Sequence, residues 1–299
     1  MQHFKKYKLT SSQFPARFHV LLTFTQQNKT RALHLIAMAS EEPQITLYWL
    51  EKSRADRVVW LLEELNAPYN VELFRRTAEF LAPPELAKIH PLGKSPIVSV
   101  TPPGEDAKPI ILAESAFIST YLCDHLPGGQ KLVPKKWKDG MEGKFGGETE
   151  EWLRYEYLMH YVEGSLMPPL VLIVVFSTVK SGAPFFVRPI VNIIADRVLS
   201  SFVIPTLRKH LGYLEQLLST SAGGYLCGKD LTAADIIISY AVIAFDGRAD
   251  QVMTFKEGSW RAAYPKLAAY VDRLKENEGY KRSQAKIKEI EGNDKSSKL

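Results

Sequence analysis

The segment from His90 to Val98, His-Pro-Leu-Gly-Lys-Ser-Pro-Ile-Val, constrains the fold more than any other part of the chain. Pro96 opens an apolar run that is typical of a β-strand, and an X-Pro bond is the ordinary place for a cis peptide. A cis bond there would turn the backbone N–H and C=O of Ser95 outward, where they could pair with an extended peptide. We therefore expect a peptide-binding edge at this proline.

A second strand and a helix follow this segment. After a turn rich in Pro and Gly, residues 110–112 predict a short strand, and Glu114-Ser115 opens a helix. A carboxylate beside the free N–H groups of a helix start can hold an amino-acid zwitterion, with its ammonium on Glu114 and its carboxylate on Ser115 and the helix N-terminus. Together these segments predict a small site for a peptide that ends in an amino acid.

Upstream of this site the chain alternates between strands and helices. Residues 44–50 and 69–74 have strand composition, and residues 54–66 have the apolar periodicity of a helix with Ser53 at its N-cap position. With a further short helix and a closing helix over 115–126, the order is β-α-β-α-β-β-α, that of a thioredoxin-like domain. No Cys-x-x-Cys follows the first strand, so dithiol exchange is not expected.

The second half of the chain has helical periodicity after a break in composition. From residue 148, apolar residues recur every three or four positions as far as Pro168-Pro169, which must kink or end that helix. Asp235 follows Thr232 at the spacing of a capping box. Further helices are expected over 188–218, 233–244 and 265–277.

These patterns predict an α/β thioredoxin-like N-terminal domain plus an all-α C-terminal domain. The expected divisions are an extension over 1–39 (disordered or targeting), the thioredoxin-like domain over 44–127, a linker over 128–147, the all-helical domain over 148–285 and a tail over 286–299.

The basic excess of the chain lies in its first 39 residues. The 299 residues carry a formal net charge of +5, with 38 Lys and Arg against 33 Asp and Glu, yet residues 1–39 hold six of the basic residues and no acid. The remainder is nearly neutral and gives no electrostatic case for nucleic-acid binding. The extension has the composition of a mitochondrial transit peptide, but Met38, just before the first strand, is an alternative start.

The spacing of the cysteines and the length of the apolar stretches indicate the redox environment of the chain and its relation to membranes. Cys123 and Cys227 lie far apart without metal-ligand spacing, so we expect reduced structural thiols and no metal site. The longest apolar stretch, Leu170–Phe176, is far shorter than the ~20 residues that cross a bilayer, so we expect no transmembrane span, although peripheral membrane contact is compatible with it. The expected location is cytoplasmic. The alternatives are mitochondrial, if residues 1–37 are a real transit peptide, or peripheral on the endoplasmic reticulum membrane.

Several ordered motifs together resemble the glutathione-binding domain of the glutathione S-transferase family, most closely its fungal subgroup of the yeast glutathione transferase I type. The similarity covers about residues 44–285 and rests on Ser53-Arg54-Ala55, Pro83-Pro84-Glu85-Leu86, the segment from Ile89 to Pro96, and Ile111-Leu112-Ala113-Glu114-Ser115.

The resemblance implies the glutathione transferase fold and a set of glutathione contacts. It implies a cis peptide at Pro96, with Ser95 pairing with the cysteinyl backbone and with Glu114 and Ser115 holding the γ-glutamyl end. His90 and Lys94 are candidates for the glycine carboxylate. Two of these residues also have simpler interpretations, because Ser115 is a suitable N-cap and Glu114 a suitable first-turn acid.

Activation of the glutathione thiol has more than one candidate residue. A free thiol has a pKa of ~8.5, and lowering it by two units needs ~2.7 kcal/mol of preferential stabilisation of the thiolate. One charge-assisted hydrogen bond and a helix N-terminus can supply this. Some family members use a Ser at the turn after the first strand and others a Tyr on that strand, so we rank Ser53 first, Tyr48 second and the cation of Arg54 third.

The function that the resemblance implies is a glutathione S-transferase that conjugates the glutathione thiolate to hydrophobic electrophiles in detoxification, with glutathione peroxidase activity as a side reaction. Glutathione is the co-substrate, no other cofactor is expected, and a homodimer is expected from the family. Tyr155 and Met159 belong either to the electrophile pocket or, as their helical spacing favours, to the core. The alternative function is a non-catalytic glutathione-binding regulatory module of the same fold.

Overall fold

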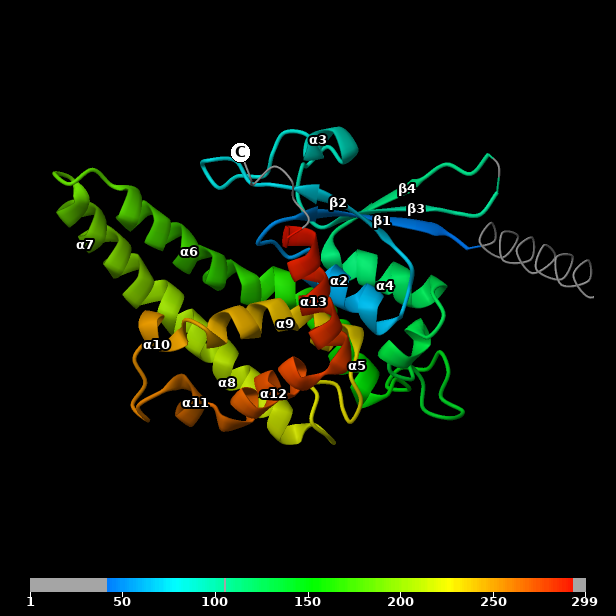
Figure 1. Ribbon diagram of the computed structural model, residues 1–299. Coiled ribbons are helices and arrows are strands. Elements are labelled where there is room, and N and C mark those ends of the chain that lie inside the picture. The colour runs from blue at the N-terminus through cyan, green and yellow to red at the C-terminus, as the bar shows by residue number, and fades with distance from the viewer. Residues whose placement is uncertain (1–41, 105, 293–299) are drawn as a thin grey trace, which may run out of the picture. The chain divides into compact units, whose positions relative to one another are not determined.

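The computed structural model describes residues 42–104 and 106–292 (Figure 1). The predicted extension over 1–39 lies outside these residues, as does the part of the predicted tail from residue 293. The described chain forms two compact units, one of residues 42–44 and 100–110 and the other of residues 45–99 and 111–292. All the predicted site residues belong to the larger unit.

The sheet has the predicted strands in the order β2-β1-β3-β4. Strands β1 (Gln44–Leu50) and β2 (Asn70–Phe74) are parallel, with Thr46 opposite Asn70, and helix α2 (Asp56–Glu64) connects them. Strands β3 (Ile97–Thr101) and β4 (Ile110–Ala113) are neighbours joined by a short turn, which only an antiparallel pair allows. With α3 (Leu86–Ile89) and α4 (Ser115–His125), the predicted β-α-β-α-β-β-α order is confirmed.

Helix α2 begins later than its sequence pattern indicates. The prediction started it at Arg54 with Ser53 as N-cap, whereas the helix starts at Asp56 and its N-cap position is Ala55, which makes no side-chain cap. Residues 53–55 form a turn ahead of the helix, and Ser53 Oγ accepts the backbone N–H of Ala55 at 3.1 Å, which is the kind of bond by which a serine caps a helix start. Ser53 therefore lies in the turn that precedes the helix.

Two long helical segments follow the linker, and each contains a π-helical turn ahead of a proline. The first consists of α5 (Glu150–Tyr161), η2 (Val162–Leu166) and α6 (Met167–Gly182), and the second of α7 (Arg188–Val198), η3 (Leu199–Val203) and α8 (Ile204–Thr220). A proline ring clashes with the carbonyl four residues earlier, and a wider π turn relieves that clash. Pro168-Pro169 therefore stay inside a continuous helix, where we expected a kink or an end.

The remaining helices complete the larger unit. They are α9 (Ala233–Asp246), α10 (Ala249–Val252), α11 (Trp260–Ala263), α12 (Pro265–Glu276) and α13 (Glu278–Gly292), and a 3₁₀ turn, η1 (Gly129–Leu132), lies in the predicted linker. Helix α13 continues past residue 285, where the tail was predicted to begin. It packs along α2, with the rings of Trp60 and Tyr280 5.0 Å apart, so this part of the C-terminal segment belongs to the fold (Figure 1).

Asp235 is the buried centre of the capping structure at the start of α9. Its carboxylate accepts hydrogen bonds from the backbone N–H of Thr232 at 2.9 Å and from the Thr232 hydroxyl at 2.7 Å. It also accepts from the backbone N–H of Leu226 at 3.1 Å and from the Tyr270 hydroxyl at 2.8 Å. One side chain thus joins the loop before α9, the helix itself and α12.

We expect Asp235→Ala to lower the free energy of unfolding by at least ~3 kcal/mol, because several buried donors lose their acceptor at ~1–3 kcal/mol each. Urea denaturation followed by circular dichroism measures this. The matched control is Asp230→Ala, which removes an exposed carboxylate nearby and should change stability by less than ~0.5 kcal/mol. Equal midpoints for the two variants would contradict the role of Asp235.

Candidate functional site

Ser53 lies in the turn between β1 and α2 and contacts the cis-proline segment. Its side chain is buried, with 5% of the residue exposed, and its Oγ lies 3.1 Å from Ser95 Oγ. The same Oγ accepts the Ala55 N–H. The turn thus places a serine hydroxyl ahead of the N-terminus of α2 and beside the residue that precedes Pro96.

The peptide between Ser95 and Pro96 is cis, as the resemblance implied. The preceding turn is closed by a hydrogen bond from Gly93 N–H to the His90 carbonyl at 2.8 Å, and Gly93 has a φ of +56°, where a side chain would be strained. His90 Nδ1 accepts the Leu92 N–H within this turn at 3.4 Å. Lys94 is exposed and, among the described residues, has no hydrogen bond or ion pair, so its ammonium remains available to a ligand.

Glu114 and Ser115 stand at the start of α4 in an unusual backbone geometry. Glu114 has φ 71° and ψ 117°, a sparsely populated conformation for a residue with a side chain, and such residues cluster at binding sites. Its carboxylate is exposed and pairs with no other group in the described part of the chain. Ser115 is buried, and no side chain caps the first N–H groups of the helix. The helix N-terminus is therefore available to an anion.

Arg57 connects Ser115 to the helical region of the chain. It lies in the first turn of α2 with its side chain fully buried, and its Nη1 donates to Ser115 Oγ at 3.2 Å. The same Nη1 pairs with Oε1 of Glu163, which lies in the π turn η2. The other oxygen of Glu163 pairs with Arg54. One carboxylate thus holds two guanidinium groups, and the cluster keeps one net positive charge beside Ser115.

The Arg57 guanidinium is costly to bury and only partly compensated. Burial lowers the pKa of Arg57, and the Glu163 carboxylate opposes that shift, so the group remains charged at neutral pH. Nε and Nη2 of Arg57 have no hydrogen-bond partner among the described residues. The guanidinium lies over the Tyr240 ring at 5.4 Å, where a cation–π interaction stabilises it.

The sequence analysis did not single out Arg57 or Glu163, although the position of each in its predicted helix indicates a buried charge. Arg57 stands four residues before Leu61 and Glu163 four residues after Met159, so each lies on the apolar face of its predicted helix. A lone charge on an apolar face usually has a buried partner. Two such charges of opposite sign on different helices indicate an ion pair between them.

Tyr48, the second candidate for thiol activation, has its hydroxyl engaged elsewhere. That hydroxyl donates to Ser99 Oγ at 3.4 Å, and the Tyr48 ring lies 6.3 Å from the Phe74 ring. The ring packs against the core cluster of Leu50, Leu86 and Ile97. Ser53 therefore contacts Ser95 directly, whereas the Tyr48 hydroxyl is bonded to Ser99 in strand β3.

Other groups that could carry chemistry are buried or absent in the described chain. Burial raises the pKa of the Cys123 thiol to about 12 and also raises that of Cys227, so neither supplies a thiolate at neutral pH. Tyr155 and Met159 are 3% and 4% exposed and belong to the core. Residues 42–104 and 106–292 contain no group of three His, Cys, Asp or Glu arranged to hold a metal ion.

We expect Glu163→Gln to lower the free energy of unfolding by ~3 kcal/mol, because it leaves the Arg57 charge buried without a counter-charge. The matched control is Glu156→Gln, on the same long helix. Among the described residues its carboxylate pairs with His160 alone, at the surface, and this pair should contribute less than ~0.5 kcal/mol. Chemical denaturation of both variants measures the difference. A Glu163→Gln protein as stable as the control would show that Arg57 does not depend on this carboxylate.

Comparison with known proteins places these features in one family. Residues 53–125 match the family description "Glutathione S-transferase, N-terminal domain", and residues 194–282 match "Glutathione S-transferase, C-terminal domain". Glutathione S-transferase 1 of Saccharomyces cerevisiae is 32% identical over 253 residues, which are 84% of this chain and 98% of that protein. Glutathione S-transferase 3 of Schizosaccharomyces pombe is 32% identical over 67% of this chain and 74% of that protein.

A solved structure shares the fold of this chain. A solved glutathione transferase family member from Pseudomonas fluorescens, with two glutathione molecules bound, aligns with a TM-score of 0.56 at 20% identity and covers 80% of this chain and 91% of that one. The thioredoxin-like sheet with its cis proline and the helices that follow it agree with this alignment. From its fold, its motifs and these relatives, the chain belongs to the glutathione S-transferase family.

Proposed function

We propose that this chain binds glutathione as its co-substrate, activates the thiol with Ser53, and conjugates the thiolate to hydrophobic electrophiles. The observation that carries the proposal is the 3.1 Å contact of Ser53 Oγ with Ser95 Oγ, at the cis proline and ahead of a helix N-terminus. The similar solved structure with glutathione bound supports the choice of ligand.

In the proposed complex the two ends of glutathione have different partners. The backbone of Ser95 pairs with the cysteinyl residue, and the exposed Glu114 carboxylate receives the γ-glutamyl ammonium. Ser115 already accepts a hydrogen bond from Arg57, so its own proton is free to donate to the γ-glutamyl carboxylate. Arg57 thereby acts through Ser115 as a positioning residue. Lys94 and His90 lie in the preceding turn, where they are candidates for the glycine carboxylate.

The surroundings of Ser53 favour donation of its proton to a thiolate. A hydroxyl has one proton and two acceptor positions. Ser53 Oγ accepts the Ala55 N–H, and in the proposed arrangement it also accepts the Ser95 hydroxyl, which leaves its own proton for the sulfur. Such a charge-assisted bond contributes ~1.5–3 kcal/mol, enough to lower a thiol pKa by about one to two units.

Once the thiolate has formed, its attack on an electrophile mainly requires that the two reacting atoms are held close together in the right orientation. Holding the thiolate and the electrophile in line replaces a bimolecular encounter by a step within one complex. The same thiolate attacks organic hydroperoxides, so we also propose a glutathione peroxidase side reaction. We also propose a homodimer and a role in detoxification, because both are expected of the glutathione S-transferase family.

Replacing Ser53 by Ala should lower kcat/KM for an activated aryl halide about 10- to 100-fold and raise the kinetic pKa by about one to two units, because the thiolate loses a charge-assisted hydrogen bond. Rates measured from pH 5.5 to 9 at saturating glutathione, with the concentration of the aryl halide varied below its KM, check this. The matched control is Tyr48→Phe, which removes a hydroxyl bonded to Ser99 and should change kcat/KM by less than about threefold.

Two results would overturn parts of the proposal. An unchanged rate and kinetic pKa in Ser53→Ala, with a large loss in Tyr48→Phe, would assign activation to the tyrosine. Retention of the natural protein on immobilised glutathione without turnover of any aryl halide or hydroperoxide would identify a binding module in place of an enzyme.

A further inference from the structure

The hairpin of α6 and α7 exposes an unusual amount of apolar surface. Phe185 and Phe186, in the turn between the two helices, are 84% and 70% exposed. Branched residues continue this surface along both helices, among them Val175, Val179, Ile190 and Ile193. Single exposed apolar residues are normal, but a contiguous set of this kind marks an interaction surface.

The hairpin stands apart from most of the helical core. The main contacts of α7 are with α6 and η3, and the two helices run side by side away from the other helices of the larger unit (Figure 1). Two long helical segments, Glu150–Gly182 and Arg188–Thr220, are apolar enough to cross a membrane by composition, and only 22% and 17% of their most apolar windows are buried.

The packing of these segments is incompatible with a full membrane span: each is 33 residues long, but its inner half belongs to the core. Their inner halves carry core residues such as Leu158 and Leu211, which are 0% and 2% exposed. Helix α6 has 16 residues and is therefore about 24 Å long, shorter than the ~30 Å hydrocarbon core of a bilayer. The free part of the hairpin is thus long enough to enter one leaflet and too short to cross both.

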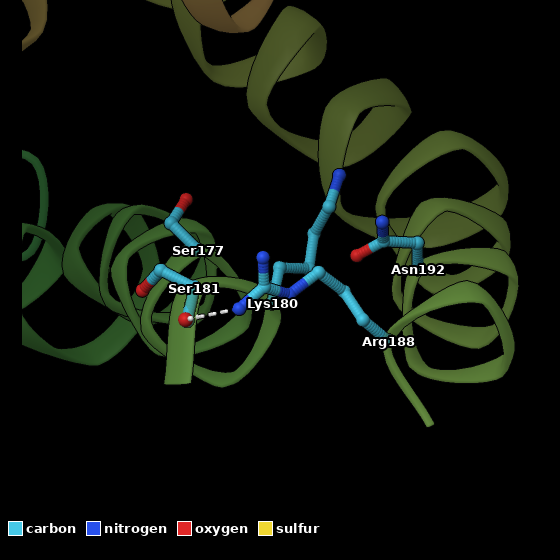
Figure 2. A pocket seen from close by; sticks show the side chains of 5 residues that line it. All are labelled: Ser177, Lys180, Ser181, Arg188 and Asn192. Carbon is cyan, nitrogen blue, oxygen red and sulfur yellow. Dashed lines mark hydrogen bonds between the residues drawn. The ribbon is translucent and has the colours of Figure 1, made fainter. Parts of the chain in front are cut away.

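A polar, basic pocket lies between the same two helices near the aromatic turn. It has a volume of about 370 Å³ and is lined by Ser177, Lys180, Ser181, Arg188 and Asn192, which come from both helices (Figure 2). Arg188 donates to the carbonyls of Ala183 at 3.0 Å and Ser181 at 3.5 Å, so its guanidinium charge has no carboxylate partner in the described chain. Asn192 Oδ1 is buried and accepts no hydrogen bond from the described residues.

The charge balance of the pocket favours an anion. Lys180 pairs with Asp196 at 2.6 Å, and Arg188 has no carboxylate partner among the described residues, so the two cations and this carboxylate leave one net positive charge. Guanidinium and ammonium groups bind phosphate through charge-assisted hydrogen bonds. A phosphate group held here would have exposed apolar side chains next to it, which is the environment of a phospholipid headgroup above its acyl chains.

We propose that the α6–α7 hairpin binds the surface of an anionic phospholipid bilayer. Phe185 and Phe186 enter the acyl region, and Lys180 and Arg188 bind lipid phosphates at the headgroup level. The proposal does not depend on the chain being catalytically active.

Vesicle flotation of the full chain tests the proposal, with phosphatidylcholine vesicles compared with vesicles that also contain phosphatidylserine. The natural protein should float with the anionic vesicles, and high salt should weaken this binding because the charge contribution is screened. The double variant Phe185→Ser/Phe186→Ser should lose bound protein about tenfold or more, since two apolar anchors are removed. The double variant Lys180→Gln/Arg188→Gln should lose the preference for anionic vesicles.

The matched control is Phe145→Ser, which removes a fully exposed phenylalanine from the predicted linker and should float like the natural protein. Thermal melting shows that each variant is folded. The proposal would be overturned if the natural protein did not float, or if the Phe185/Phe186 variant floated as well as the control. It would also be overturned if the natural protein formed a dimer without lipid and the Phe185/Phe186 variant alone were monomeric, because the hairpin would then be a contact between two copies of the chain. A melting shift with inorganic phosphate but no vesicle binding would likewise reject a bilayer as the ligand.

Discussion

The ion pair between the fully buried Arg57 and the partly exposed Glu163 is the interaction on which the candidate site depends. Arg57 belongs to the first helix of the thioredoxin-like region and Glu163 to a π turn more than a hundred residues later, within the same compact unit. Because the Arg57 side chain is fully buried, its charge would be strongly destabilising without the Glu163 carboxylate. The pair therefore fixes α2 relative to the long helix, and through Arg57 it fixes the hydroxyl of Ser115, where the γ-glutamyl carboxylate is proposed to bind.

The turn at Ser53 shows how a local departure from helix geometry serves a site. In the structure Ser53 bonds to Ala55 and approaches Ser95, so its hydroxyl faces the cis-proline strand. The net positive charge of Arg54, Arg57 and Glu163 favours an anion in the same region. The proposed thiolate thus has a donor and a favourable field without a metal ion.

Sequence patterns predicted the features that depend on neighbouring residues. The strands, the acid at the start of α4 and the capping role of Asp235 follow from local periodicity or motif, the cis proline follows from the family resemblance, and the structure contains them. The partner of Arg57, the Ser99 contact of Tyr48 and the start of α2 at Asp56 depend on elements far apart in the chain, which spacing alone does not place. The packing of α13 on α2 was missed for the same reason, because a polar C-terminal segment without strong periodicity resembles a tail.

Calorimetric titration of reduced glutathione into the full chain tests the central claim most directly, because it needs neither an electrophile nor turnover. The account predicts saturable heat with one glutathione per chain, and an affinity about 10- to 100-fold weaker in Glu114→Gln, which loses the charge-assisted bond to the γ-glutamyl ammonium. Absence of binding heat at millimolar glutathione, or unchanged affinity in Glu114→Gln, would contradict the assignment of this site.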